Sequence, residues 1–149
     1  MASCGYLGFI PRRLWGTDSG AGTFGAAVGT GAGAVLLAIG APWWCTLGAA
    51  VVATALSLWA AAPFSADHGD PGWVCIDETA GALLALVGLT MWWPFGVAAV
   101  VARLADIYKV LPGVALAERT LPGSIGVTAD DLVAGLYGLA AGWAIMAVL

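Results

Sequence analysis

Charge is what this sequence lacks most. The 149 residues include only five Lys or Arg and nine Asp or Glu. Three stretches, residues 19–66, 79–102 and 132–149, contain no charged residue and run for 48, 24 and 18 residues. A soluble domain of this length needs a charged surface that such a chain cannot form. The scarcity of charge therefore excludes an ordinary soluble protein and indicates a single membrane domain.

Basic residues and paired cysteines are also scarce. With five basic residues and a formal net charge of −4, the chain has no electrostatic footprint for nucleic acid, so we expect no such partner. Cys4, Cys45 and Cys75 are widely spaced and form no CxxC pair. We therefore expect buried thiols, with neither a zinc site nor a redox site. Arg12 and Arg13 precede a glycine-rich run that continues into further apolar segments, which argues against a cleaved signal sequence.

The apolar stretches divide into five expected helices. A membrane helix needs about 20 apolar residues, so the first stretch holds two. Its break falls at residues 42–44 (Pro-Trp-Trp), and a second break falls at residues 92–94 (Trp-Trp-Pro). The sequence therefore predicts an all-α integral membrane bundle of about five helices. Their expected ranges are 23–39, 45–62, 74–91, 94–110 and 130–149.

This arrangement places the charges at one end of the bundle. If each helix crosses the membrane, the two uncharged turns at 42–44 and 92–94 lie on one side. The N-terminal segment and the charged segments around 67–78 and 103–131 then lie on the other side. Lys and Arg mark the cytoplasmic face of membrane proteins. We therefore expect the charged end, and any active site in it, to face the cytoplasm.

Small residues recur three or four positions apart in three of the expected helices. Such ridges let helix backbones approach closely in lipid, so we interpret them as packing surfaces without chemistry. They could pack within one chain or between two, which leaves a homo-oligomer open. The ridges are Gly25, Gly29 and Gly33; Gly81, Ala85 and Gly88; and Gly135, Gly138 and Gly142.

Acidic residues from three expected helices converge on the charged end. Asp77 and Glu78 open the third helix, Asp106 lies late in the fourth, and Asp130 and Asp131 open the fifth. One acid at each helix start can be explained by capping and the helix dipole. Two adjacent pairs are harder to explain this way, because adjacent helical residues point about 100° apart. A Mg²⁺ site, which prefers oxygen ligands, is the alternative that we favour.

Basic and glycine-rich elements lie beside these acids. Arg103, Asp106 and Lys109 follow one side of a helix, either as an ion pair at the membrane surface or as a cationic arm for phosphate. The glycine-rich segments 20–25 and 123–126 precede expected helices, where free N–H groups bind anions. The candidate phosphate contacts in these segments are Thr23, Gly123, Ser124 and Gly126. His68, in the loop with Asp67 and Asp70, is either solvated or an acid–base or metal residue.

Together these segments resemble phosphatidylglycerophosphatase A, a family of bacterial membrane lipid phosphatases. The segments that match lie, in order, at residues 20–25, 74–81, 103–109 and 123–135. The chain departs from the family pattern at Ala21, Val110 and Ser124, which affects loop shape and leaves every acidic and basic position of the pattern in place.

The resemblance implies a specific reaction and location. It implies Mg²⁺-dependent hydrolysis of the terminal phosphate of phosphatidylglycerophosphate, which gives phosphatidylglycerol, in the bacterial inner membrane. Residue reasoning and resemblance agree on metal ligands at Asp77, Glu78, Asp130 and Asp131. Asp77, Glu78, Asp106 and Asp131 are the expected catalytic residues, with Arg103 and Lys109 on the phosphoryl oxygens. Either water or a carboxylate could attack the phosphorus.

Three alternatives remain open at this stage. A phosphatase for another lipid phosphate would use the same residues. A small ion-transport subunit would need polar groups near the membrane midplane and access from both faces. The uncharged end of the expected bundle argues against it. A membrane scaffold without catalysis would not need the motif acids.

Overall fold

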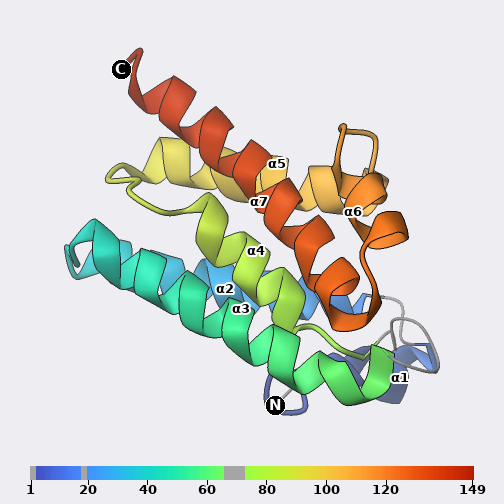
Figure 1. Cartoon of the computed structure of the whole chain (residues 1–149). Coiled ribbons are helices and arrows are strands. Elements are labelled where there is room, and N and C mark those ends of the chain that lie inside the picture. Colours follow the sequence, from blue (N-terminus) through green and yellow to red (C-terminus); the bar gives the residue numbers. More distant parts are fainter. Residues whose placement is uncertain (1–2, 18–19, 66–72) are drawn as a thin grey trace.

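The computed structural model describes residues 3–17, 20–65 and 73–149, and the regular secondary structure of this described part is all helical. It contains seven α-helices and one short 3-10 helix, η1 (Figure 1). The bounds are η1 Leu7–Phe9, α1 Ile10–Trp15, α2 Ala21–Ala38, α3 Trp43–Ser65, α4 Ile76–Ala85, α5 Trp92–Tyr108, α6 Val114–Thr120 and α7 Gly123–Met146.

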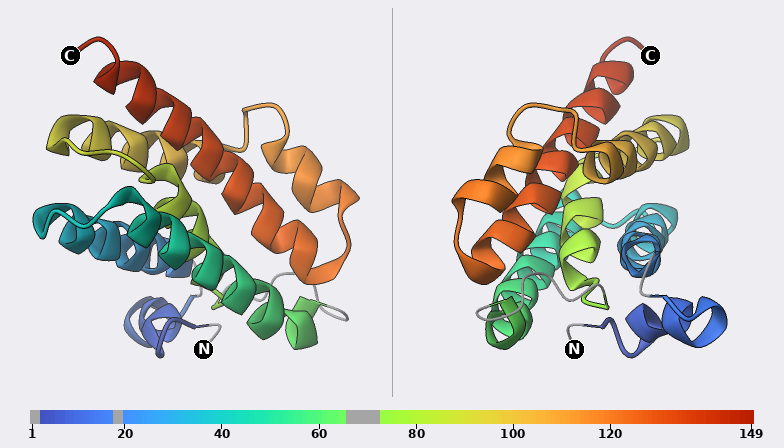
Figure 2. Two further views of the ribbon diagram at one scale, coloured as in Figure 1. Left: turned by 60° about the vertical axis from the view of Figure 1, so that its left-hand side comes forward. Right: turned by 90° about the vertical axis from the view of Figure 1, so that its right-hand side faces the viewer.

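Helix α4 lies at the centre of the molecule. It packs against α2, α3, α5 and α7, which surround it in both orientations of Figure 2. Seven of its ten residues are buried. Because a helix rises about 1.5 Å per residue, α4 is about 15 Å long, roughly half the thickness of a hydrocarbon core. This central helix cannot cross a membrane by itself.

The helix expected over residues 74–91 is therefore shorter in the structure. The chain leaves the helix after Ala85, and Gly88 takes a positive φ of 75° that L side chains rarely adopt. The indole N–H of Trp143 on α7 donates a hydrogen bond of 3.1 Å to the Val87 carbonyl. Leu86 and Leu89 are buried. Irregular backbone of this kind is tolerated at membrane depth where protein surrounds it.

The last helix also differs from expectation. It begins at Gly123 instead of residue 130, because Pro122 supplies an extended N-cap (φ −79°, ψ 144°). Asp130 and Asp131 therefore lie two turns inside α7 and do not open it. The segment expected as a loop over 111–129 contains α6 as well as this first part of α7. The other three expected helices are found as α2, α3 and α5, with shifts of a few residues at their ends.

The tryptophan-rich connections lie at the opposite end of the molecule from the charged residues of α6 and the end of α5. The α2–α3 and α4–α5 connections lie at one end with the C-terminus of the chain, whereas α6 and the start of α7 lie at the other (Figure 1). Trp43, Trp44, Trp92 and Trp93 are exposed beside these connections. Aromatic residues of this kind suit a membrane interface. The arrangement agrees with the expected alternation of uncharged turns and charged segments.

Among the described residues, two helices are long and apolar enough to cross a membrane, within Ala21–Ala38 and Trp43–Ala60. Less than a third of each span is buried in this chain, and large apolar side chains such as Val35, Val52 and Leu58 are exposed on them. Exposed apolar surface of this extent marks a surface that meets lipid or another protein.

Glycines allow the helices to approach closely within the one chain. A Cβ built on Gly29 of α2 would lie 2.6 Å from the Thr79 carbonyl oxygen, and one on Gly138 of α7 would lie 2.5 Å from the Ala98 carbonyl oxygen. Neither distance is compatible with a side chain. These two ridges pack α2 onto α4, and α7 onto α4 and α5, within the one chain.

Buried hydroxyl groups also link the helices. Thr79 on α4 donates to the Gly25 carbonyl of α2 over 2.8 Å, and Ser57 on α3 lies 2.8 Å from the hydroxyl of Thr128 on α7. Ser57 and Thr128 are each almost fully buried. Such contacts hold helices together where lipid removes most of the hydrophobic driving force.

Candidate active site

Three carboxylates meet where the start of α4 faces the middle of α7. One oxygen from each of Asp77, Glu78 and Asp131 lies within 4.8 Å of the others. Asp77 and Asp131 are buried, and Glu78 is half-buried. Asp77 also accepts the Glu78 backbone N–H over 3.0 Å, which satisfies one of the free N–H groups at the start of α4. The structure thus brings three of the four expected metal ligands together.

A close backbone approach creates this meeting point. A Cβ built on Gly81 would lie 2.5 Å from the carbonyl oxygen of Asp131, and one on Gly135 would lie 2.5 Å from the carbonyl oxygen of Gly81. Because neither residue has a side chain, the backbones of α4 and α7 touch directly. On α4 the contact lies one helical turn after Asp77, and on α7 it lies at Asp131 itself. The glycine ridges, which we interpreted as packing alone, position the acidic side chains.

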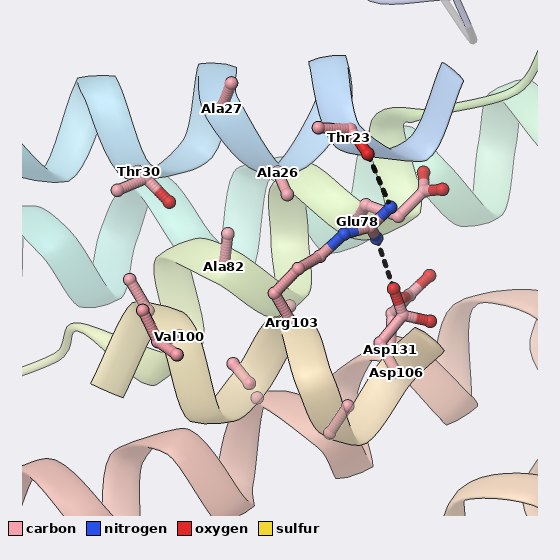
Figure 3. A pocket seen from close by; sticks show the side chains of 15 residues that line it. Thr23, Ala26, Ala27, Thr30, Glu78, Ala82, Val100, Arg103, Asp106 and Asp131 are labelled. Carbon is pink, nitrogen blue, oxygen red and sulfur yellow. Dashed lines mark hydrogen bonds and ion pairs between the residues drawn. The ribbon is translucent and has the colours of Figure 1, made fainter. Parts of the chain in front are cut away.

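The carboxylates open onto a cavity of about 290 Å³ between α2, α4, α5 and α7 (Figure 3). Its charged lining is confined to one part, where Glu78, Arg103, Asp106 and Asp131 lie together with the hydroxyl group of Thr23. The rest is lined by small apolar residues, such as Ala26 on α2 and Ala99 on α5, and by Thr30.

Arg103 connects α5 to α2 at the polar part of the cavity. Its side chain extends from α5 toward α2, where Nη2 donates to the Thr23 hydroxyl over 3.1 Å (Figure 3). The same guanidinium forms an ion pair with Asp106, one turn along α5. Thr23, Arg103 and Asp106, all expected site residues, therefore lie in one hydrogen-bonded group.

Two polar atoms at this site are buried without a hydrogen-bond partner among the described residues. They are Oε2 of Glu78 and Nε of Arg103. A buried acceptor left unpaired is costly, and so is a cluster of three carboxylates without a cation among them. Asp77, Glu78 and Asp131 offer the oxygen ligands that hard divalent cations prefer. The donor set fits Mg²⁺, and Arg103 fits a phosphate beside it.

Asp130 and Lys109 occupy a neighbouring position. The Lys109 ammonium lies 2.6 Å from a carboxylate oxygen of Asp130. Adjacent residues on α7 point in different directions, so Asp130 faces Lys109 while Asp131 faces α4. The structure does not bring Asp130 into the three-carboxylate group, nor Lys109 into the cavity lining. Their expected roles as metal ligand and phosphate contact remain predictions.

The second glycine-rich segment lies away from the cavity. Gly123, Ser124 and Gly126 form the first turn of α7, and none of them lines the cavity. Gly123 precedes Asp131 by eight residues, which is about 12 Å along a helix axis. Their expected phosphate contacts are therefore not brought together with Arg103. His68 lies outside the described residues.

Sequence reasoning missed several residues around the site. Gly22 belongs to the candidate glycine-rich segment 20–25 but was not singled out within it; it lies directly against the Glu78 carboxylate, and a Cβ there would lie 3.1 Å from Nη2 of Arg103. The apolar lining, including Ala27 and Val100, was also missed. Helical spacing offered a signal, since Thr23, Ala27 and Thr30 recur four and three positions apart on α2. Nothing in the spacing indicated which helix this face would meet.

These features define a class of protein: an all-helical chain with membrane-capable helices and an acidic, arginine-containing cavity. Comparison with known proteins gives the family. The family model for phosphatidylglycerophosphatase A matches residues 1–146, and the chain belongs to this family. A relative from Bacteroides thetaiotaomicron, named a putative phosphatidylinositol-3-phosphatase, is 35 % identical over 145 residues, which cover 87 % of this chain and 89 % of the relative. No solved structure matches the chain.

The resemblance found in the sequence motifs is thereby confirmed. Membership of this family supports a lipid phosphatase of the phosphatidylglycerophosphatase type, with a phospholipid as its substrate. The family and the two membrane-capable helices together indicate a membrane protein.

Proposed function

We propose that this protein hydrolyses the terminal phosphate monoester of phosphatidylglycerophosphate in a Mg²⁺-dependent reaction, giving phosphatidylglycerol and phosphate. The observation that carries the proposal is that Glu78, Asp131 and Arg103 line the same cavity, with a carboxylate oxygen of Asp77 within 4.8 Å of oxygens of both acids. A phosphatase needs to hold a dianionic phosphate and offset the charge that develops as its ester bond breaks. Family membership supports the same reaction class.

The chain's own residues have distinct roles in this proposal. Arg103 binds the phosphoryl oxygens, and Asp106 and Thr23 hold its guanidinium across the cavity. Asp77, Glu78 and Asp131 would hold Mg²⁺, with Glu78 Oε2 as the oxygen that has no other partner among the described residues. When bound, the cation would stabilise the charge on the phosphoryl group and acidify a water molecule. Asp131, the acid of α7 that lines the cavity, could accept a proton from the attacking water.

The pairing of Lys109 with Asp130 assigns them a supporting role in this proposal. Their contact fixes the end of α5 against α7 and so keeps Arg103 and Asp131 on the same cavity. The Lys109 side chain is a third exposed, and Lys109 is the C-cap of α5, in a left-handed conformation (φ 48°). A positive charge at a helix C-terminus is favourable, which supports this placement.

The orientation of the protein follows from the same charges. We propose a multi-pass protein of a bacterial inner membrane with the cavity near the cytoplasmic surface. Arg103, Lys109 and Arg119 all belong to the end of α5 and to α6, away from the tryptophan-rich connections (Figure 1). The absence of charge from residues 79–102 and 132–149 argues against a path for ions across the bundle.

A second substrate is favoured by one specific observation. The relative from Bacteroides thetaiotaomicron carries the name of a phosphatidylinositol-3-phosphatase. Phosphatidylinositol 3-phosphate and phosphatidylglycerophosphate both present a phosphate monoester on a lipid headgroup, so the same carboxylates and arginine would serve either.

A substrate panel tests both candidates. The purified protein in detergent would be assayed for phosphate release from phosphatidylglycerophosphate, phosphatidylinositol 3-phosphate and phosphatidate, with Mg²⁺ and with a chelator. We expect the highest kcat/KM on phosphatidylglycerophosphate and no release with chelator. A higher kcat/KM on one of the other two lipids would identify that lipid as the preferred substrate. Phosphate release that is unchanged by chelator would exclude the proposed role of Mg²⁺.

A further inference from the structure

The cavity extends beyond the polar groups that the proposed chemistry uses. From Arg103 it continues between α2 and α5, with Ala82 of α4 as its floor (Figure 3). Thr23, Ala27 and Val100 are exposed at its edges, whereas Ala82 and Ala102 are buried inside it. The cavity therefore opens sideways, through the flank of the bundle, between two largely apolar helices.

This lateral opening has two defined ends. At the polar end, the hydrogen bond from Arg103 to Thr23 joins α5 to α2. At the other end, the apolar cluster that contains Leu86 and Phe95 packs against Ala34 and Leu37 of α2. Between these ends, α2 rests on α4 and has no extensive packing with α5. An apolar slot thus leads from the outer flank to the carboxylates.

The side chains along the slot are small. Ala26, Ala27 and Thr30 line it from α2, and Ala99 and Val100 line it from α5. A volume of about 290 Å³ falls at the lower limit of pockets that hold a drug-sized molecule, so a whole phospholipid does not fit inside. The phosphorylated headgroup fits at the polar end, and the apolar slot fits the first part of a hydrocarbon chain whose remainder stays outside.

We propose that the slot between α2 and α5 is the lateral entry and acyl-chain site for a glycerophospholipid phosphate monoester. This inference rests on the proposed lipid phosphatase function and adds the route by which the substrate reaches Arg103. The phosphate enters from the flank of α2, a membrane-capable helix, while the acyl chain remains against apolar surface. The lipid is therefore never removed from the hydrocarbon to reach the carboxylates.

A second groove, also formed by described residues, is a competing site for the acyl chain. This groove of about 380 Å³, lined by α3 residues such as Val51 and Leu58 together with Leu84 and Leu132, is entirely apolar in its side chains apart from Thr54. None of the site residues Glu78, Arg103 and Asp131 lines that groove. The continuity of the α2–α5 slot with all three favours the slot.

Photolabelling tests the location without requiring turnover. The probe is a non-hydrolysable phosphonate analogue of a glycerophospholipid phosphate with a diazirine on its acyl chain, and the labelled peptides are identified by mass spectrometry. We expect label on α2 and α5, within residues 21–38 and 92–108, that is competed by unlabelled lipid phosphate. Competed label confined to α3, or label without competition, would overturn the proposal.

Bulky variants provide the functional test. Ala27→Phe and Ala99→Leu would fill the slot, and Ala32→Phe is the matched control because Ala32 is exposed on α2 and does not line the cavity. With a lipid phosphate of 16-carbon chains, we expect kcat/KM to fall at least tenfold in the two slot variants, mainly through KM, and less than twofold in the control. Equal activity in all three variants would overturn the proposal that the slot holds the acyl chain. Absence of turnover in the wild-type protein would instead overturn the proposed function, whereas the photolabelling result would still locate the bound lipid.

Discussion

Gly81 of α4 and Gly135 of α7 touch through their backbones. A Cβ on Gly135 would lie 2.5 Å from the Gly81 carbonyl oxygen, and a Cβ on Gly81 would lie as close to the carbonyl oxygen of Asp131. This contact fixes how far Asp131 stands from Asp77 and Glu78. The packing of α4 against α7 and the geometry of the carboxylate site are therefore one feature of the molecule.

Gly135→Ala should separate α4 from α7. The added methyl group meets backbone, which cannot move aside as a side chain does, so we expect a loss of about 1–3 kcal/mol in stability. Phosphatase activity should fall further than stability alone explains, because Asp131 moves away from α4. Gly31→Ala is the control, since Gly31 is an exposed helical glycine with open space around it. Thermal unfolding in detergent, with activity measured well below the transition, checks both effects. Equal behaviour of the two variants would contradict the close contact.

Gly22→Ala should reduce activity with little effect on folding. A Cβ at this position meets the Glu78 carboxylate and approaches Arg103, both of which are side chains that can shift. The substitution therefore displaces the groups proposed to hold the cation and the phosphate. We expect kcat/KM to fall tenfold or more at an unchanged unfolding temperature. Gly96→Ala, on α5 with nothing near its Cβ position, provides the comparison. Full activity in Gly22→Ala would show that Glu78 does not need its present position.

Lys109 and Asp130 should be energetically coupled. Asp130 is buried and lies 2.6 Å from Lys109, so removal of one partner leaves a poorly solvated charge. We expect Lys109→Met to destabilise the protein more than the double variant Lys109→Met/Asp130→Asn does. A double-mutant cycle of unfolding free energies should give a coupling of about 1 kcal/mol or more. Additive effects would indicate that the pair contributes nothing beyond its separate residues.

Ser57 and Thr128 should contribute to stability without affecting catalysis. Their hydroxyl groups lie 2.8 Å apart between α3 and α7, away from the cavity lining. Ser57→Ala leaves the Thr128 hydroxyl buried without this partner, and contacts of this type contribute about 0.6 kcal/mol on average in membrane proteins. We therefore expect a small decrease in unfolding temperature and an unchanged KM. A change in KM would place this contact within the site.

The sequence predicted the all-helical class and most of the helices. It did not predict where α4 ends or how far inside α7 the acidic residues lie. Long uncharged stretches and Pro-Trp breaks located α2, α3 and α5 because length and hydrophobicity alone determine such helices. The early end of α4 depends on Gly88 and on the hydrogen bond from Trp143, which comes from a distant part of the chain. No local sequence pattern predicts the contact between Trp143 and Val87, which are 56 residues apart.

For the site as well, the sequence identified the residues but did not predict how they are arranged. Acids and bases of the motifs could be identified one by one, and Asp77, Glu78, Arg103, Asp106 and Asp131 do come together. Which acid of the 130–131 pair faces α4 depends on the rotation of α7, which the glycine contacts set through tertiary packing. The start of α7 at Gly123 likewise depends on the cap at Pro122, and it moves the second glycine-rich segment away from the cavity.

The most direct test of the account is the Mg²⁺ dependence of phosphate release from phosphatidylglycerophosphate in wild-type protein, Asp131→Asn and Asp130→Asn. If Asp77, Glu78 and Asp131 hold the cation, the wild type releases phosphate only with Mg²⁺, Asp131→Asn loses at least a hundredfold in kcat/KM, and Asp130→Asn keeps much of its activity. Full activity in Asp131→Asn, with Mg²⁺ dependence unchanged, would contradict the central claim.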